Sequence, residues 1–143
     1  MRLFLDANVV FSAAHSSEGN ARALFELAAG SWCSLLSSPY ALEEARRNIA
    51  LRYSVVINEL DRLITALEVV PEGSAERISW AVSLGVPEKD APILAAASQA
   101  RADCLVTGDK SHFGHLYGRK LGRLIVRSPA DTLESLLKLR ARR

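Results

Sequence analysis

The chain has 143 residues, of which 49% are hydrophobic and 24% charged, and this balance excludes a disordered chain. No apolar run approaches the roughly 20 residues of a membrane-spanning helix, and Asp6 interrupts the apolar stretch that a secretory signal peptide needs. The formal net charge of +2 is too small to identify a partner. We therefore expect a cytoplasmic protein without a membrane segment, folded as one domain over residues 1–143.

Short apolar runs alternate with segments of helical periodicity along the chain. In chain order the pattern predicts a strand at 3–5, a helix at 20–29, a strand at 32–37, helices that begin at 39 and 57, a strand at 67–70, helices at 74–84 and 91–102, a strand at 104–107, a helix after it, a strand at 124–126 and a final helix from 129. The helix starts at Ser38-Pro39 and Ser128-Pro129 combine a serine N-cap with a first-turn proline. Strands separated by helices predict an α/β sandwich with a mainly parallel sheet between two helical layers.

Three aspartates stand where predicted strands end or helices begin. Asp6 follows the first strand, Asp109 follows the strand at 104–107, and Asp90 precedes the helix that leads into that strand. The carboxyl ends of parallel strands form one edge of the sheet, where ligands collect. Asp90 is equally well explained as a helix N-cap and Asp109 as a turn residue. Asp6 is harder to explain structurally, because an unpaired carboxylate after a buried strand is costly.

A fourth carboxylate, Glu43 or Glu44, lies on the helix after the second strand, and helical periodicity does not choose between the two. Two carboxylates about 4 Å apart repel by roughly 4 kcal/mol at an effective dielectric near 20, so a cluster needs a cation. Mg²⁺ or Mn²⁺ fits such carboxylates, whereas Zn²⁺ prefers His and Cys ligands, which we expect this edge to lack. A divalent ion there would suit phosphodiester hydrolysis.

Four motifs, in this order, resemble the PIN-domain family over nearly the whole chain. They are Leu5-Asp6-Ala7-Asn8, Ser38-Pro39 followed by Glu44, Lys89-Asp90-Ala91-Pro92 and Val106-Thr107-Gly108-Asp109. The resemblance implies a five-stranded parallel sheet and a Mg²⁺- or Mn²⁺-dependent endoribonuclease, similar to the toxin of bacterial VapBC toxin–antitoxin modules. It places the metal-binding and catalytic roles on Asp6, Glu44, Asp90 and Asp109, with Asn8 and Thr107 in support. The spacing from Ser38 favours Glu44 over Glu43 as the fourth carboxylate. The family also implies a homodimer and a small antitoxin partner.

Several other polar residues lie near these motifs. Ser111 stands where some relatives carry another acid or amide, and its hydroxyl can only assist, for example by holding a water. His112 and His115 have i, i+3 spacing, but we disfavour a metal pair because no further soft ligand lies nearby in the sequence. The cationic candidates for binding RNA are Arg46, Arg47, Lys110 and Arg119.

The remaining residues that chemistry could use have simpler explanations. We expect His15 to lie in a surface loop, Cys33 and Cys104 to be reduced and buried, and Trp32 and Trp80 to belong to the core. No Gly-x-Gly-x-x-Gly follows the first strand and no Gly-x-x-x-x-Gly-Lys is present, which excludes the common nucleotide-binding folds. The alternative to an enzyme is a PIN fold that binds RNA or protein without cleaving it.

Overall fold

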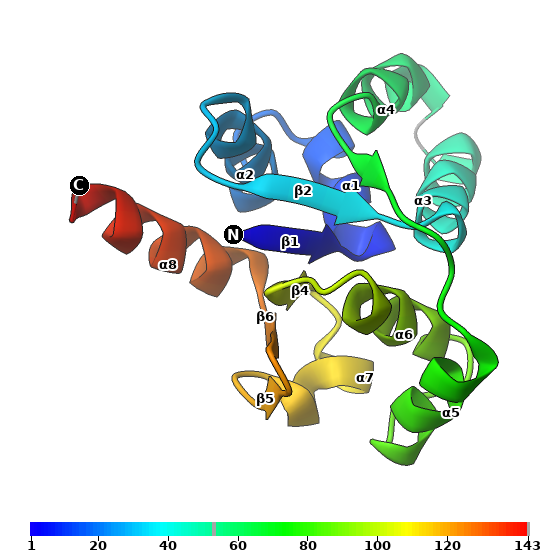
Figure 1. Ribbon diagram of the computed structural model, residues 1–143. Coiled ribbons are helices and arrows are strands. Elements are labelled where there is room, and N and C mark those ends of the chain that lie inside the picture. The colour runs from blue at the N-terminus through cyan, green and yellow to red at the C-terminus, as the bar shows by residue number, and fades with distance from the viewer. Residues whose placement is uncertain (53, 143) are drawn as a thin grey trace.

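The computed structural model describes residues 1–52 and 54–142 and contains a central sheet between two layers of helices (Figure 1). The strands are β1 (Arg2–Leu5), β2 (Ser34–Ser37), β3 (Glu68–Val69), β4 (Cys104–Val106), β5 (Lys120–Leu121) and β6 (Leu124–Arg127). Their order in the sheet is β3-β2-β1-β4-β6-β5, and every pair is parallel except β5 with β6. The predicted α/β architecture is therefore confirmed, with six strands in place of five.

Eight α-helices and two short 3₁₀ helices connect these strands among the described residues. They are α1 (Ala7–His15), α2 (Asn20–Ala29), α3 (Pro39–Arg52), η1 (Ser54–Val56), α4 (Ile57–Ile64), α5 (Ala75–Ser83), α6 (Ala91–Gln99), α7 (Lys110–Phe113), η2 (Gly114–Leu116) and α8 (Pro129–Ala141). Apolar residues of α1, α2, α3, α4 and α8 pack in one cluster, and those of α5, α6 and α7 pack in another.

Alternation along the central strands produces these two cores. Leu3 and Leu5 of β1 join the cluster of α1 to α4 and α8, whereas Phe4 between them joins the other cluster. Leu105 of β4 likewise faces the α5–α7 layer. Successive side chains of a strand point to opposite faces, so a continuous apolar run is what a sheet covered on both sides requires.

Two elements were not predicted. Residues 7–15 were assigned no element, but Asp6 caps α1 directly after β1 by accepting a hydrogen bond from the Ala7 N–H. His15 is thus the exposed last residue of α1 and not part of a loop. The sixth strand, β5, forms a two-residue hairpin with β6 around Gly122, whose φ of 68° suits glycine. Its shortness leaves no alternating pattern to read.

The expectation of buried cysteines is confirmed, and that of core tryptophans holds only in part. Cys33 and Cys104 are free and buried, whereas Trp32 and Trp80 are only partly buried at the margins of the two cores. Within residues 1–52 and 54–142, no helix has both the length and the apolar character to cross a membrane.

The central strands bring the ends of β1 and β4 together. Leu5 pairs with Val106 in parallel register, and the Asp6 N–H continues the ladder by donating to the Val106 carbonyl at 3.0 Å. The next residues, Asp6 and Thr107, therefore lie side by side at the carboxyl edge of the sheet. Any site at this edge is built on the two most central strands.

Candidate active site

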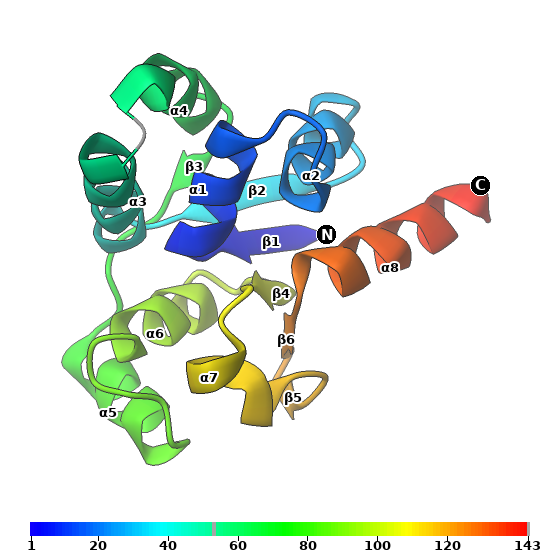
Figure 2. The ribbon, with the colours of Figure 1, turned by 180° about the vertical axis from the view of Figure 1, so that it is seen from behind.

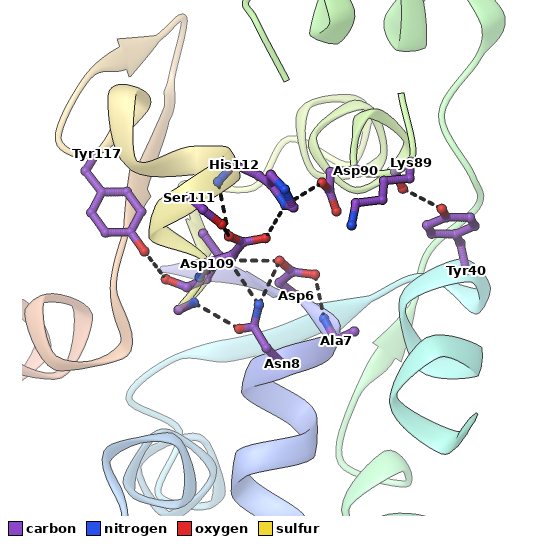
Figure 3. Close-up of polar contacts among 12 residues, drawn as sticks. Asp6, Ala7, Asn8, Tyr40, Lys89, Asp90, Asp109, Ser111, His112 and Tyr117 are labelled. Carbon is purple, nitrogen blue, oxygen red and sulfur yellow. Dashed lines mark hydrogen bonds and ion pairs between the residues drawn. The ribbon is translucent and has the colours of Figure 1, made fainter. Parts of the chain in front are cut away.

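Asp6 lies at the carboxyl edge of the sheet and is buried, with 4% of its surface exposed (Figure 3). Its Oδ1 accepts from the Ala7 N–H at 2.7 Å, and its Oδ2 accepts from the Thr107 hydroxyl at 2.8 Å and from Asn8 Nδ2 at 3.2 Å. Burial raises the pKa of Asp6 to about 6, against the lowering effect of the bonds from Thr107 and Ala7. The negative charges of Glu44 and Asp90 raise it further.

Asn8 and Thr107 also fix the loop after β4. Asn8 Oδ1 accepts from the Gly108 N–H at 2.9 Å, and the Thr107 hydroxyl accepts from the Asp109 N–H at 3.1 Å. Each of these two residues thus contacts Asp6 and, at the same time, the backbone that carries Asp109. This arrangement sets the position of Asp109 relative to Asp6.

Asp109 caps α7 and is held by the residues that follow it. Its Oδ1 accepts from the Ser111 hydroxyl at 2.9 Å and from the His112 N–H at 3.1 Å, and its Oδ2 lies 2.7 Å from His112 Nδ1. Burial alone would raise the pKa of Asp109, but the bonds from Ser111 and His112 outweigh it and lower the pKa. Asp109 is therefore an ionised carboxylate near neutral pH.

Asp90 completes a close group with Asp109 and His112. One ligand atom from each of these three residues lies within 4.8 Å of the other two. Asp90 Oδ2 is 3.0 Å from His112 Nδ1, but that nitrogen is hydrogen-bonded to Asp109. Among the described residues, Asp90 Oδ2 therefore has no hydrogen-bond partner although the atom is buried. Burial, as the largest effect, raises the pKa of Asp90.

The ligand atoms that this group offers suit a divalent cation. A buried carboxylate oxygen that accepts no hydrogen bond is costly, and a cation is the usual partner of clustered carboxylates. Hard oxygen ligands suit Mg²⁺ and Mn²⁺. The expectation that this edge lacks histidine was wrong, because α7 brings His112 against Asp90 and Asp109. His115 does not join it, since its Nε2 lies 2.8 Å from the Leu84 carbonyl.

Glu44 and Glu43 occupy different positions on α3. Glu44 is half-buried and its charge acts on Asp6, whereas Glu43 is exposed. Tyr40, one helical turn before Glu44, donates its hydroxyl hydrogen to the Lys89 carbonyl. This bond ties α3 to the segment that carries Asp90, so α3 and the start of α6 are coupled at the site (Figure 3).

The predicted cationic residues are more scattered. Arg46 pairs with Asp61 at 2.7 Å, and Lys110 is the exposed first residue of α7. Arg47 is exposed on α3, where its charge acts on Tyr40, and Arg119 is exposed after η2. Lys110 thus directly follows Asp109, Arg47 acts on Tyr40, and Arg46 is held in an ion pair.

A family model described as PIN domain matches residues 2–111, which is well over half of the chain. The chain belongs to the PIN domain family. The match includes Asp6, Glu44, Asp90 and Asp109, so all four acids lie in the matched part of this PIN domain. No curated protein matches the sequence.

Solved structures of low identity share the fold. PAE2754 from Pyrobaculum aerophilum has a TM-score of 0.69 and 14% identity over 96% of each chain. VapBC2 from Rickettsia felis has a TM-score of 0.65 and 18% identity over 90% of this chain and 98% of that chain. Mycobacterium tuberculosis VapC20 has a TM-score of 0.58 and 15% identity over 79% of this chain and 94% of that chain.

We expect the thermal stabilisation of this PIN domain by Mn²⁺ to grow between pH 5 and pH 7. The folded protein without metal retains a proton on Asp6 up to a pKa of about 6, against a usual value of 3.8. That proton favours the folded state fully below the usual pKa, and its contribution is lost as the pH rises through about 6. A metal ligand must lose the same proton, so Mn²⁺ held by Asp6 should bind more tightly above pH 6.

This pH dependence is measured as the difference in Tm with and without Mn²⁺ at pH 5, 6 and 7. Carboxylates that do not contact the metal affect both Tm values equally, so their titration does not change the difference. A difference that stays constant across this range would show that Asp6 is not a ligand.

We also expect Tyr40→Phe to weaken Mn²⁺ binding by about threefold to tenfold with little change in fold. The substitution removes only the hydroxyl that holds the Lys89 carbonyl, and such a bond contributes roughly 0.5–1.5 kcal/mol. Calorimetric titration with Mn²⁺ measures the change. An affinity equal to that of the unsubstituted protein would mean that Tyr40 does not position Asp90.

Sequence reasoning missed the positions of His112 and Tyr40. Asp109 is followed three residues later by His112, and this spacing places both side chains on one face of a helix if Asp109 is its N-cap. Tyr40 has no comparable signal, because its partner Lys89 is 49 residues away in the sequence.

Proposed function

We propose that this PIN domain is a metal-dependent endoribonuclease that holds Mg²⁺ or Mn²⁺ with Asp6, Glu44, Asp90 and Asp109. The observation that carries the proposal is the buried Asp90 oxygen, which has no hydrogen bond from any described residue and lies beside a second carboxylate and His112. A cation at this position would neutralise charges that the protein itself leaves only partly compensated. A divalent ion held there would supply Lewis-acid activation of the phosphodiester and of the attacking water.

The chain's own residues prepare this site in three ways. Thr107 and Asn8 direct their donors at Asp6 Oδ2, which orients its carboxylate. Ser111 and His112 hold Asp109 in its ionised form. Burial of Asp6 at the ends of β1 and β4 excludes water from the innermost part of the site, where charge interactions are strongest.

We further propose that the protein is the toxin of a toxin–antitoxin pair, acts as a cytoplasmic homodimer, and is inhibited by a small antitoxin. Support comes from similar solved structures. VapC20 is described as a toxin that cleaves the sarcin-ricin loop, and a structure from Klebsiella pneumoniae as a toxin–antitoxin complex.

The test is cleavage of end-labelled single-stranded RNA by the purified protein in Mg²⁺ or Mn²⁺, with EDTA in a parallel reaction. We expect internal cuts that depend on metal. RNA that is bound but never cut, in the presence of bound Mn²⁺, would favour the alternative of a non-catalytic binding module.

A further inference from the structure

A groove leads away from the acidic edge along α1. A hollow of about 450 Å³ beside Asp109 is lined by Asn8, Val9, Ser12, Gly108, Asp109 and Pro129. A second hollow of about 640 Å³ extends to the starts of α2 and α8. Both hollows share Ser12, Gly108 and Pro129, so they adjoin. We call the two together the α1 groove.

One wall of the α1 groove is a polar stripe that runs along α1 to its C-cap residue, Ser16. Asn8, Ser12 and Ser16 follow one another at intervals of four residues, and neighbouring positions such as Val10 and Ala13 are buried in the core. At a rise of 1.5 Å per residue, this stripe runs for roughly 12 Å from Asn8, which contacts Asp6. The first polar group of the groove therefore belongs to the acidic site itself.

The far end of the groove offers hydrogen-bond donors and positive charge. No side chain in the described part of the chain caps the start of α2, where Asn20 is the first helical residue. The backbone N–H groups in the first turn of α2 carry the positive end of the helix dipole. Lys110 lines the same hollow from α7. Figure 2 shows α1 and α2 on one side of β1 and α7 on the other.

We propose that the α1 groove holds the single RNA strand that flanks the bond to be cut, with a phosphate near Lys110 and the start of α2. The inference rests on the proposed ribonuclease function, because it takes the acidic edge as the point of cleavage. An RNA strand that is cut beside Asp109 must extend away from the acidic site, and the groove opens directly from that residue. Asp131 also lines the larger hollow, so we place the phosphate away from α8.

A strand of RNA fits this groove better than a helical peptide does. An amphipathic peptide needs apolar pockets for its anchor residues. Among the described residues that line the larger hollow, none is a large aliphatic side chain, and Tyr117 is the one aromatic. Serine hydroxyls, an amide and a lysine are instead the groups that bind a sugar-phosphate strand.

The test is RNA binding by charge variants of Asn20, which is exposed and lies in the groove. Asn20→Glu should weaken the binding of a fluorescent single-stranded oligoribonucleotide several-fold in EDTA, and Asn20→Lys should tighten it by a similar factor. The slope of log Kd against log salt should become shallower for Glu and steeper for Lys, by about 0.7 for each phosphate contact. A glutamate in the first turn of a helix is favourable, so Asn20→Glu should stay folded.

Ala75 provides the matched control, because it is the exposed first residue of α5, a helix of the opposite layer. Ala75→Glu and Ala75→Lys carry the same charge changes and should alter Kd by less than twofold. Affinities that change equally at positions 20 and 75 would overturn the groove, since only overall charge would then matter. Unchanged affinity in both Asn20 variants would also overturn it and leave the groove to a protein partner.

Because binding is measured in EDTA, this test is independent of cleavage. A protein that cuts no RNA but binds it in an Asn20-dependent way would contradict the ribonuclease and retain the groove. Metal-dependent cleavage with Asn20-independent binding would give the opposite result.

Discussion

Replacing Asp6 with asparagine is expected to lower metal-dependent RNA cleavage by about a thousandfold or more and to leave the fold intact. A divalent metal contributes several kcal/mol to charge stabilisation in the transition state, and each 1.36 kcal/mol corresponds to a factor of ten in rate. Asp6 is the most buried of the four acids and contacts two further site residues, Asn8 and Thr107. Its loss should therefore remove metal affinity and activity together.

The same substitution should stabilise the protein without metal at pH 7.5, by on the order of 1 kcal/mol. Burial raises the pKa of Asp6 to about 6, so the ionised form present at that pH is unfavourable in the folded state. Asparagine carries no charge, and its carbonyl oxygen can still accept the Ala7 N–H. The measurements are single-turnover cleavage of labelled RNA and thermal unfolding in EDTA.

Asp103 is the matched control for this prediction. It is a partly buried aspartate whose side chain accepts from the Arg2 N–H at 2.7 Å and from Arg123 at 3.1 Å. Burial opposes these bonds, but their net effect lowers the pKa of Asp103. Asp103→Asn should therefore lose stability and retain cleavage. Full activity in Asp6→Asn, or equal losses in both variants, would contradict a catalytic role for Asp6.

The second large effect is expected at Glu44, with its neighbour as an internal comparison. Glu44→Gln should lower the cleavage rate by about a hundredfold, as the loss of one group that stabilises transition-state charge commonly does. Glu43→Gln should change the rate by less than twofold. Glu44 is half-buried and its charge acts on Asp6 and Tyr40, whereas Glu43 is exposed.

Both glutamine variants keep the size and helix propensity of the original side chain, so unequal stabilities are not expected. Mn²⁺ affinity, measured by titration, should fall in the Glu44 variant alone. A larger loss of cleavage rate and Mn²⁺ affinity in Glu43→Gln than in Glu44→Gln would place the fourth carboxylate at Glu43. It would also require α3 to turn relative to β1.

The fold was predictable where the hydrophobic periodicity was clear or where the residues that start a helix were present. The strand at 3–5 and the helix at 20–29 appear with nearly the same bounds, because a buried strand and an amphipathic helix each have a clear period. Ser38 and Ser128 precede α3 and α8 as expected. Helix α1 was missed because it follows β1 with Asp6 alone between them, where a loop was expected.

The site was predictable in composition but less so in geometry. The register of β1 with β4 explains why Asp6 lies beside Thr107, two residues before Asp109, and a parallel sheet made this foreseeable. Structural and functional interpretations were set against each other for Asp109, yet the structure shows that it caps α7 while lying beside Asp90 and His112. The choice of Glu44 over Glu43 depends on how α3 packs against α1, which periodicity alone does not determine.

We expect one divalent ion site to join the ends of β1 and β4 to α3 and α6. Anomalous diffraction from crystals soaked in Mn²⁺ tests it directly, because the signal locates the metal without reference to activity. We expect a peak in contact with carboxylate oxygens of Asp6, Asp90 and Asp109. A peak only elsewhere, or none at millimolar Mn²⁺ and pH 7.5, would contradict the account.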